Sequence, residues 1–155
     1  MDPYSQALAE GIDEALPTWV QRCVRETMMA WRGEIPDEVA AAAAAAGRRA
    51  AQDVGAQVRA LLDADVDEQR TTPLSLVRAA VAYPTAVLAA AGAPPAQRDR
   101  FVTDAFPADA YDLSPASWAD VDPALTGPAL AWGAAKAFEH KRRHNNPAQA
   151  GGSAQ

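Results

Sequence analysis

The feature that most constrains the fold of this chain is a run without any charged residue, from Ala79 to Ala96. Pro84 interrupts the run, and a Gly-Ala-Pro-Pro turn closes it. In a soluble protein such a run is covered by other parts of the chain, so we expect the remaining helices to pack around it. Its length is near the lower limit for a membrane span, but it is mostly alanine and contains prolines, so we expect no span.

Apolar residues recur at helical spacing along the chain, and no stretch alternates as a half-buried strand does. The length of 155 residues suits one domain. The sequence therefore predicts an all-α, single-domain helical bundle of about six helices over residues 1–144, with a proline-broken central helix, and a disordered tail at 145–155. The expected helical segments are 5–16, 17–32, 36–63, 73–91, 95–106, 115–120 and 128–144.

Prolines and caps set most of these boundaries. Ser5 is the expected N-cap of the first helix. Pro17 is expected to end that helix and to start the next, because proline is favoured at the first helical position. Pro84 is expected to kink or restart the central helix, since it disfavours α geometry at Tyr83. In the last helix, one face carries Leu130, Ala134 and Phe138.

The charge balance and the single cysteine indicate a compartment and exclude some partners. The net charge of −6 opposes general binding to nucleic acid or to an anionic membrane, because affinity for phosphate depends on excess Lys and Arg. Cys23 cannot form an internal disulfide, which is typical of a reducing cytosol. The N-terminal residues are acidic and lack the apolar core of a signal peptide. We therefore expect a cytoplasmic protein with Cys23 in its core.

No motif predicts a metal or a cofactor. Asp63, Asp65 and Asp67 have the spacing that opens a calcium loop, but Glu68 stands where the loop needs glycine and Leu74 where it needs glutamate. His140 and His144 are four residues apart, but the cations between them would repel a metal ion. The acidic cluster is instead a candidate contact for a partner protein.

A stripe of small residues marks the expected helix 36–63. Gly47, Ala51 and Gly55 lie four residues apart on one face. Two glycines inside a helix cost about 1 kcal/mol each relative to alanine, so we expect another helix to approach this face closely. That helix belongs either to the same chain or to a second copy.

The densest mixture of polar and aromatic residues follows the uncharged run. Such groups serve as acids, bases and anion clamps in enzymes, and equally as caps and loop contacts in structural roles. A pocket between helices 73–91 and 95–106 would use Arg78, Tyr83, Arg98, Asp104, Tyr111 and Trp118.

These features give three hypotheses for function. The leading one is a cytoplasmic, non-enzymatic protein-interaction or regulatory protein, with a protein partner or with self-association through the stripe of small residues. The second is a small-molecule-binding protein or enzyme that uses the pocket. The third is a nucleic-acid accessory protein that uses Arg142 and Arg143, which the acidic net charge disfavours.

The segment from Arg70 to His140 resembles a family of small helical proteins of actinobacteria. The resemblance rests on PLSLVRAAVAYPTAVLAAAGAPPAQRDRF, FPADAYDLSPASWADVDPAL and AWGAAKAF. It implies an all-α fold and carries no activity, ligand or catalytic residue. The N-terminal third of the chain lies outside it.

Overall fold

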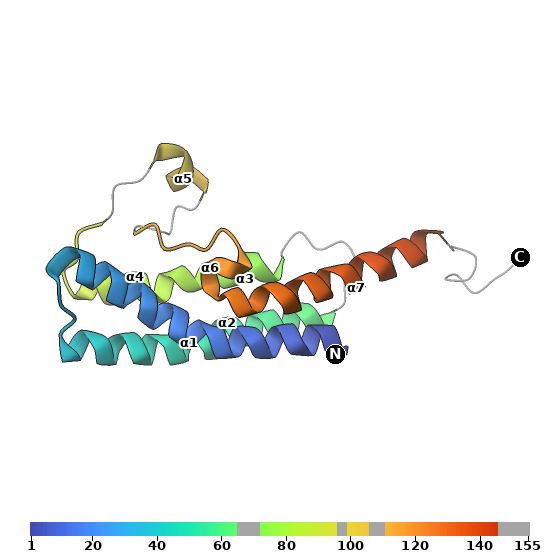
Figure 1. The fold of residues 1–155 in the computed structure, drawn as a ribbon, viewed down its shortest axis with the longest axis horizontal. Helices are drawn as coiled ribbons and strands as arrows, with labels where there is room; N and C mark the ends of the chain where they lie inside the picture. The colour runs from blue at the N-terminus through green and yellow to red at the C-terminus, as the bar shows by residue number, and fades with distance from the viewer. Residues whose placement is uncertain (65–71, 96–98, 106–110, 146–155) are drawn as a thin grey trace, which may run out of the picture.

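Two long antiparallel helices form the centre of the molecule. The computed structural model describes residues 1–64, 72–95, 99–105 and 111–145, and every regular element within them is helical. Six of the helices pack into one body, which confirms the predicted all-α bundle. The elements are α1 (Pro3–Arg32), α2 (Asp37–Ala64), α3 (Pro73–Arg78), η1 (Ala79–Val81), α4 (Ala82–Ala90), α5 (Arg100–Ala105), α6 (Trp118–Val121), η2 (Pro123–Leu125) and α7 (Thr126–Asn145) (Figure 1).

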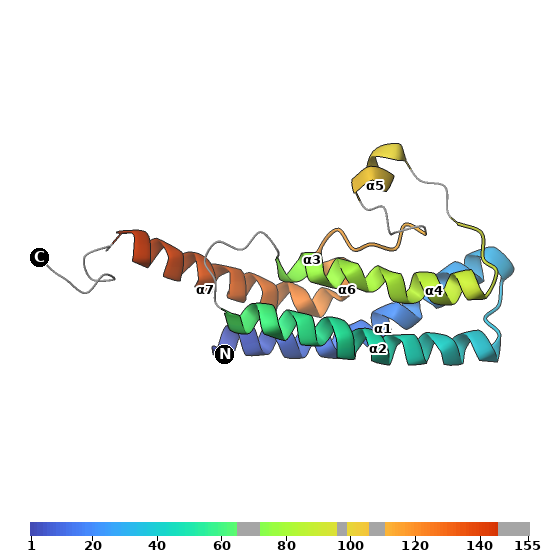
Figure 2. The ribbon, with the colours of Figure 1, turned by 180° about the vertical axis from the view of Figure 1, so that it is seen from behind.

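Helix α1 continues through Pro17, so the expected break there is wrong. Its N-cap is Asp2 rather than Ser5, with the Ser5 amide donating to Asp2 Oδ1 over 2.9 Å. An interior proline removes one backbone hydrogen bond and bends the helix, and α1 bends part-way along its length (Figures 1 and 2). The helix persists because its whole inner face is buried: Leu8, Ile12, Leu16, Val20 and Val24 are each 0% exposed.

Helix α2 runs from Asp37 to Ala64, within one residue of the predicted 36–63 at each end, and carries Asp37 and Glu38 in its first turn. It packs along α1 and buries Ala46, Ala50 and Val58 completely. Gly47 meets the bend of α1: a Cβ atom at this position would lie 2.9 Å from Pro17 O and 3.0 Å from Pro17 Cα. The predicted close approach of a helix is therefore made within the chain.

The proline-broken central helix exists, but its break precedes Pro84. Helix α3 is capped by Thr72, and η1 separates it from α4. This places Pro84 in the first turn of α4, where the missing N–H costs least. Val77, Ala80 and Leu88 are 0% exposed, whereas Ala82, Ala86 and Ala90 face solvent. The expectation that the chain packs around the uncharged run is therefore wrong, because the run packs on one side of the α1–α2 pair.

The segment after the central helix returns to α1 and begins α7. Arg22 on α1 donates from Nη2 to Asp120 O at 2.9 Å and to Val121 O at 3.0 Å, which ties α6 to the bundle. Ser117 caps α6, so the expected start of this helix at Pro115 is wrong. Helix α5 begins at Arg100 rather than at the predicted residue 95, and residues 96–98 and 106 of the prediction lie outside the described residues. It stands apart from the other helices (Figures 1 and 2), with Phe101 79% exposed.

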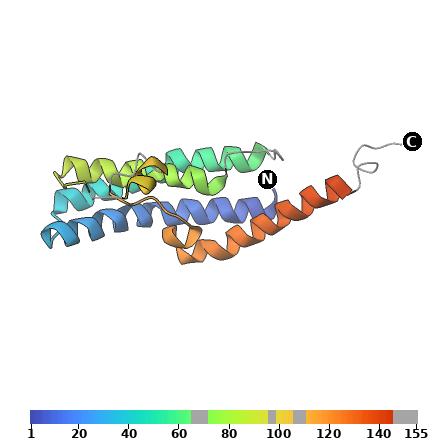
Figure 3. The same cartoon turned by 90° about the horizontal axis from the view of Figure 1, so that it is seen from above.

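Helix α7 runs antiparallel to α1 and extends past its N-terminus in all three views (Figures 1, 2 and 3). Lys136 lies level with Asp2, since Lys136 Nζ is 4.0 Å from Asp2 Oδ2. Ala137–Asn145 therefore continues beyond α1 for roughly 13 Å at 1.5 Å per residue. Of the predicted tail, residues 146–155 lie outside the described residues.

Candidate interaction surface

The predicted stripe on α2 lies inside the molecule. Gly47 packs on Pro17, and a Cβ on Gly55 would collide with the carboxylate of Asp13, which forms an ion pair with Arg59. Ala51 is half-buried and packs against the core. These three residues therefore join α2 to α1, so the intrachain alternative is the one that the structure shows.

The predicted acidic cluster is only partly described. Asp63 lies at the exposed end of α2, where its Oδ1 is 3.8 Å from the N-terminal amine. Asp65 and Asp67 lie outside the described residues. Among the described parts of the chain, no group of three His, Cys, Asp or Glu side chains is arranged to hold a metal ion.

Two of the predicted pocket residues, Arg78 and Tyr111, hydrogen-bond to different parts of the backbone. Arg78 donates from Nε to Pro115 O at 2.9 Å and from Nη2 to Ala116 O at 3.1 Å. Tyr111 is buried, and its hydroxyl donates to Ala93 O at 3.1 Å. Both side chains thus hold the segment 111–116 on the bundle. Trp118 is half-buried against the core, Asp104 is exposed on α5, and Arg98 lies outside the described residues.

Tyr83 faces a different part of the molecule. Its hydroxyl donates to Asp53 Oδ2 on α2 at 2.7 Å, beside a cavity of about 420 Å³ that Arg49 and Gln57 also line. Burial raises the pKa of Tyr83 above the ordinary value of 10.0 for a tyrosine, and the hydrogen bond to Asp53 and the charge of Asp53 add to this effect. The structure therefore brings Tyr83 to α2.

The surface that sequence analysis did not select is the outer face of α7. Leu130 is 69% exposed and Phe138 is 67% exposed, with exposed Ala134 midway between them. These residues lie four apart and therefore on one side of the helix. We call Leu130, Ala134 and Phe138 the α7 stripe. The spacing was visible in the sequence, but it could not show that Ala129 and Trp132, on the opposite side, contact the bundle.

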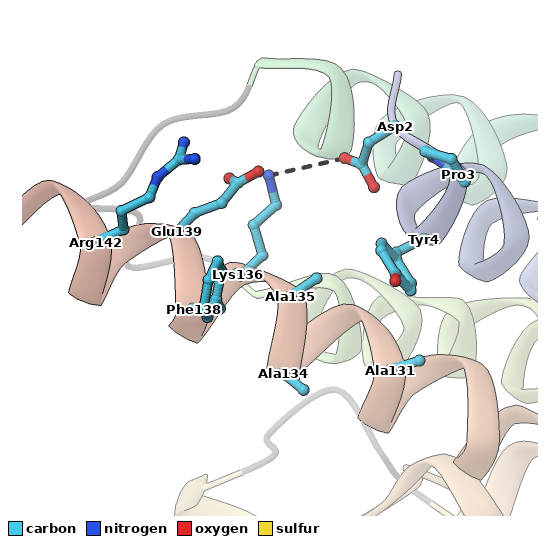
Figure 4. A pocket seen from close by; sticks show the side chains of 10 residues that line it. All are labelled: Asp2, Pro3, Tyr4, Ala131, Ala134, Ala135, Lys136, Phe138, Glu139 and Arg142. Carbon is cyan, nitrogen blue, oxygen red and sulfur yellow. Dashed lines mark ion pairs between the residues drawn. The ribbon is translucent and has the colours of Figure 1, made fainter. Parts of the chain in front are cut away.

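A hollow lies beside the α7 stripe, between α7 and the first turn of α1 (Figure 4). Its volume is about 590 Å³. Tyr4, which is 51% exposed, forms one wall, and Phe138 lies on the opposite side. Ala131, Ala134 and Ala135 form a shallow floor because their side chains are small, and Lys136, Glu139 and Arg142 stand along α7.

Charge is concentrated at one end of this surface. Helix α7 is cationic: it carries one carboxylate, Glu139, and four Lys and Arg side chains, at positions Lys136, Lys141, Arg142 and Arg143. The whole chain, by contrast, carries a net charge of −6. Burial alone would raise the pKa of Asp2, but the hydrogen bonds from Ser5 and the charge of Lys136 outweigh it, so the pKa of Asp2 lies below 3.8. The surface is therefore apolar at its centre and cationic towards the free end of α7.

Comparison with family models, with curated proteins and with solved structures found no match. The resemblance to an actinobacterial family therefore stays a prediction.

Among the described residues, one helical segment, Pro73–Ala90, is long and apolar enough to cross a membrane by length and composition alone. The core helix of a soluble protein meets the same criterion. This segment comprises α3, η1 and α4, and it packs on the α1–α2 pair.

Proposed function

We propose that this chain is a cytoplasmic, non-enzymatic protein-interaction protein, and that the α7 stripe is its docking surface. The observation that carries the proposal is the exposure of Leu130 and Phe138 on the same side of one helix. Single exposed apolar residues are ordinary, but a row of them on one helix face is typical of helix-mediated recognition.

The surroundings of the stripe support this function. Large aromatic side chains contribute most of the energy of protein interfaces, particularly where they enter a neighbouring hollow. Phe138 and Tyr4 offer such side chains beside the alanine floor. The cations at the free end of α7 form a charged rim that would orient a partner and speed its association.

The experiment is capture with the tagged full-length chain in its native host. We expect a stoichiometric polypeptide, either a second copy or another protein, to copurify with the wild-type chain and to be lost from Phe138→Asp. Phe101→Asp is the matched control, because it removes a phenylalanine that is even more exposed than Phe138 from α5, away from the stripe. Equal capture by wild-type and Phe138→Asp, or loss with Phe101→Asp alone, would overturn the proposal.

A further inference from the structure

We infer that the partner of the α7 stripe is a second copy of this chain, bound antiparallel through the same stripe. The inference rests on the proposed function and names the partner of that surface. Its basis is the order of side-chain sizes along the stripe, which is large, small, large: Leu130, Ala134 and Phe138.

An antiparallel pair of these helices that crosses at Ala134 is self-complementary. Leu130 of one copy then lies opposite Phe138 of the other, and Ala134 lies opposite its own counterpart. The distance between packed helix axes depends on the side chains at the crossing point, and two alanines allow a short distance. The two large side chains on either side of the crossing therefore meet across the interface, as an isologous twofold contact requires.

The same register brings opposite charges together. Lys141 and Arg142 follow Phe138 on exposed positions of α7. In the antiparallel pair they lie over the beginning of the second copy's α7, next to α6 and η2. That region carries two aspartates held by backbone amides: Asp120 accepts from the amide of Ser117, the N-cap of α6, and Asp122 caps η2 by accepting from the amide of Ala124. Twofold symmetry repeats this arrangement at both ends of the helix pair.

The distribution of charge, rather than the net charge, favours a second copy over a lipid surface, because two chains of net charge −6 also repel one another away from the interface. A helix with an apolar face and a cationic end also binds anionic membranes. However, the complete chain has a net charge of −6, which an anionic surface repels outside the immediate neighbourhood of α7. In the twofold pair, by contrast, the cationic end of each α7 approaches the acidic segment of the other copy.

The direct test is cysteine cross-linking of the full-length chain. Cys23 is buried, and replacing it with serine leaves one introduced thiol per chain. Ala134→Cys places two thiols at the twofold axis, so we expect rapid disulfide-linked dimers under mild oxidation. Ala137→Cys is the control: it is also exposed on α7, but its counterpart lies about six residues farther along the helix pair, beyond disulfide reach.

Three outcomes would overturn the inference. Equal cross-linking of Ala134→Cys and Ala137→Cys would indicate random collision. A monomeric wild-type chain that captures a different polypeptide through Phe138 would refute the second copy and keep the proposed function. A monomeric chain that binds vesicles of phosphatidylglycerol through Phe138, and captures no polypeptide, would refute both. Rapid cross-linking at Ala134 alone, with the dimer weakened roughly tenfold or more by Phe138→Asp and unchanged by Phe101→Asp, supports the inference.

Discussion

Gly47→Ala should destabilise this protein even though alanine is the better helix former. In an open helix the change raises the free energy of unfolding by about 1 kcal/mol. Here the new Cβ would lie 2.9 Å from Pro17 O, 3.0 Å from Pro17 Cα and 3.3 Å from Pro17 C. All three are backbone atoms and cannot rotate away, so α1 and α2 must separate.

The expected magnitude follows from two opposing terms. Overpacking of this kind costs about 1–3 kcal/mol, which exceeds the gain of about 1 kcal/mol in helix propensity. We therefore expect a net loss of about 1 kcal/mol in the free energy of unfolding. The matched control is Gly133→Ala on α7, where a Cβ meets no atom of the described residues within 4 Å.

The assay is urea unfolding of both variants beside the wild-type chain, with the slope of each transition compared as well as its midpoint. Gly133→Ala should move the midpoint up and Gly47→Ala should move it down, so the two variants differ by about 2 kcal/mol. If Gly47→Ala stabilises the chain as much as Gly133→Ala does, the close packing of α2 on Pro17 is refuted.

Three further predictions concern single side chains. Asp2→Ala should lower the free energy of unfolding by about 1 kcal/mol at neutral pH through loss of the N-cap. Because the folded pKa of Asp2 lies below 3.8, the stability that this cap contributes is present above pH 3.8 and is lost as the pH falls through the folded pKa. The free energies of unfolding of the wild type and the variant, measured by urea unfolding, should therefore converge in acid. Arg22→Met should lower the free energy of unfolding by about 1–2 kcal/mol, because it leaves the carbonyls of Asp120 and Val121 without this donor. Hydrogen exchange should be accelerated at the Asp122 amide, which donates to Trp118 O at the end of α6, and unchanged exchange there would contradict this attachment of α6 to α1. Because the pKa of Tyr83 is raised in the folded state, its contribution to the free energy of unfolding is complete below pH 10.0 and is lost as the pH rises through the folded pKa. The Tyr83→Phe chain should therefore lose less stability in alkali than the wild type. Equal losses would contradict the contact with Asp53.

Local signals in the sequence predicted much of the fold. Helix α2 follows its prediction closely, because Pro36 and the acidic first turn mark its start and no other proline interrupts it. The all-α class followed from apolar spacing alone. The sequence also predicted that the central helix is broken. It did not predict that the break precedes Pro84, because the 3₁₀ turn at η1 depends on packing against α1 and α2.

The error at Pro17 and the unidentified partner of Gly47 share one physical origin, which is tertiary packing, whereas the error at the first N-cap is local, because Asp2 and not Ser5 makes that cap. Pro17 carries the same local signal as a helix start, but burial along α1 and the space left by Gly47 allow the helix to continue. The stripe containing Gly47 predicted a close helix contact without identifying its partner. The α7 stripe was readable as a helical face, yet only the fold shows that this face points away from the bundle.

The measurement that tests the central claim most directly is sedimentation equilibrium of the full-length wild-type chain beside Phe138→Asp. The account predicts a wild-type mass approaching twice the 16.3 kDa of one chain, and a variant that sediments as a monomer with unchanged helix content by circular dichroism. A wild-type chain that is monomeric at all concentrations, or a dimer that Phe138→Asp leaves intact, would contradict it.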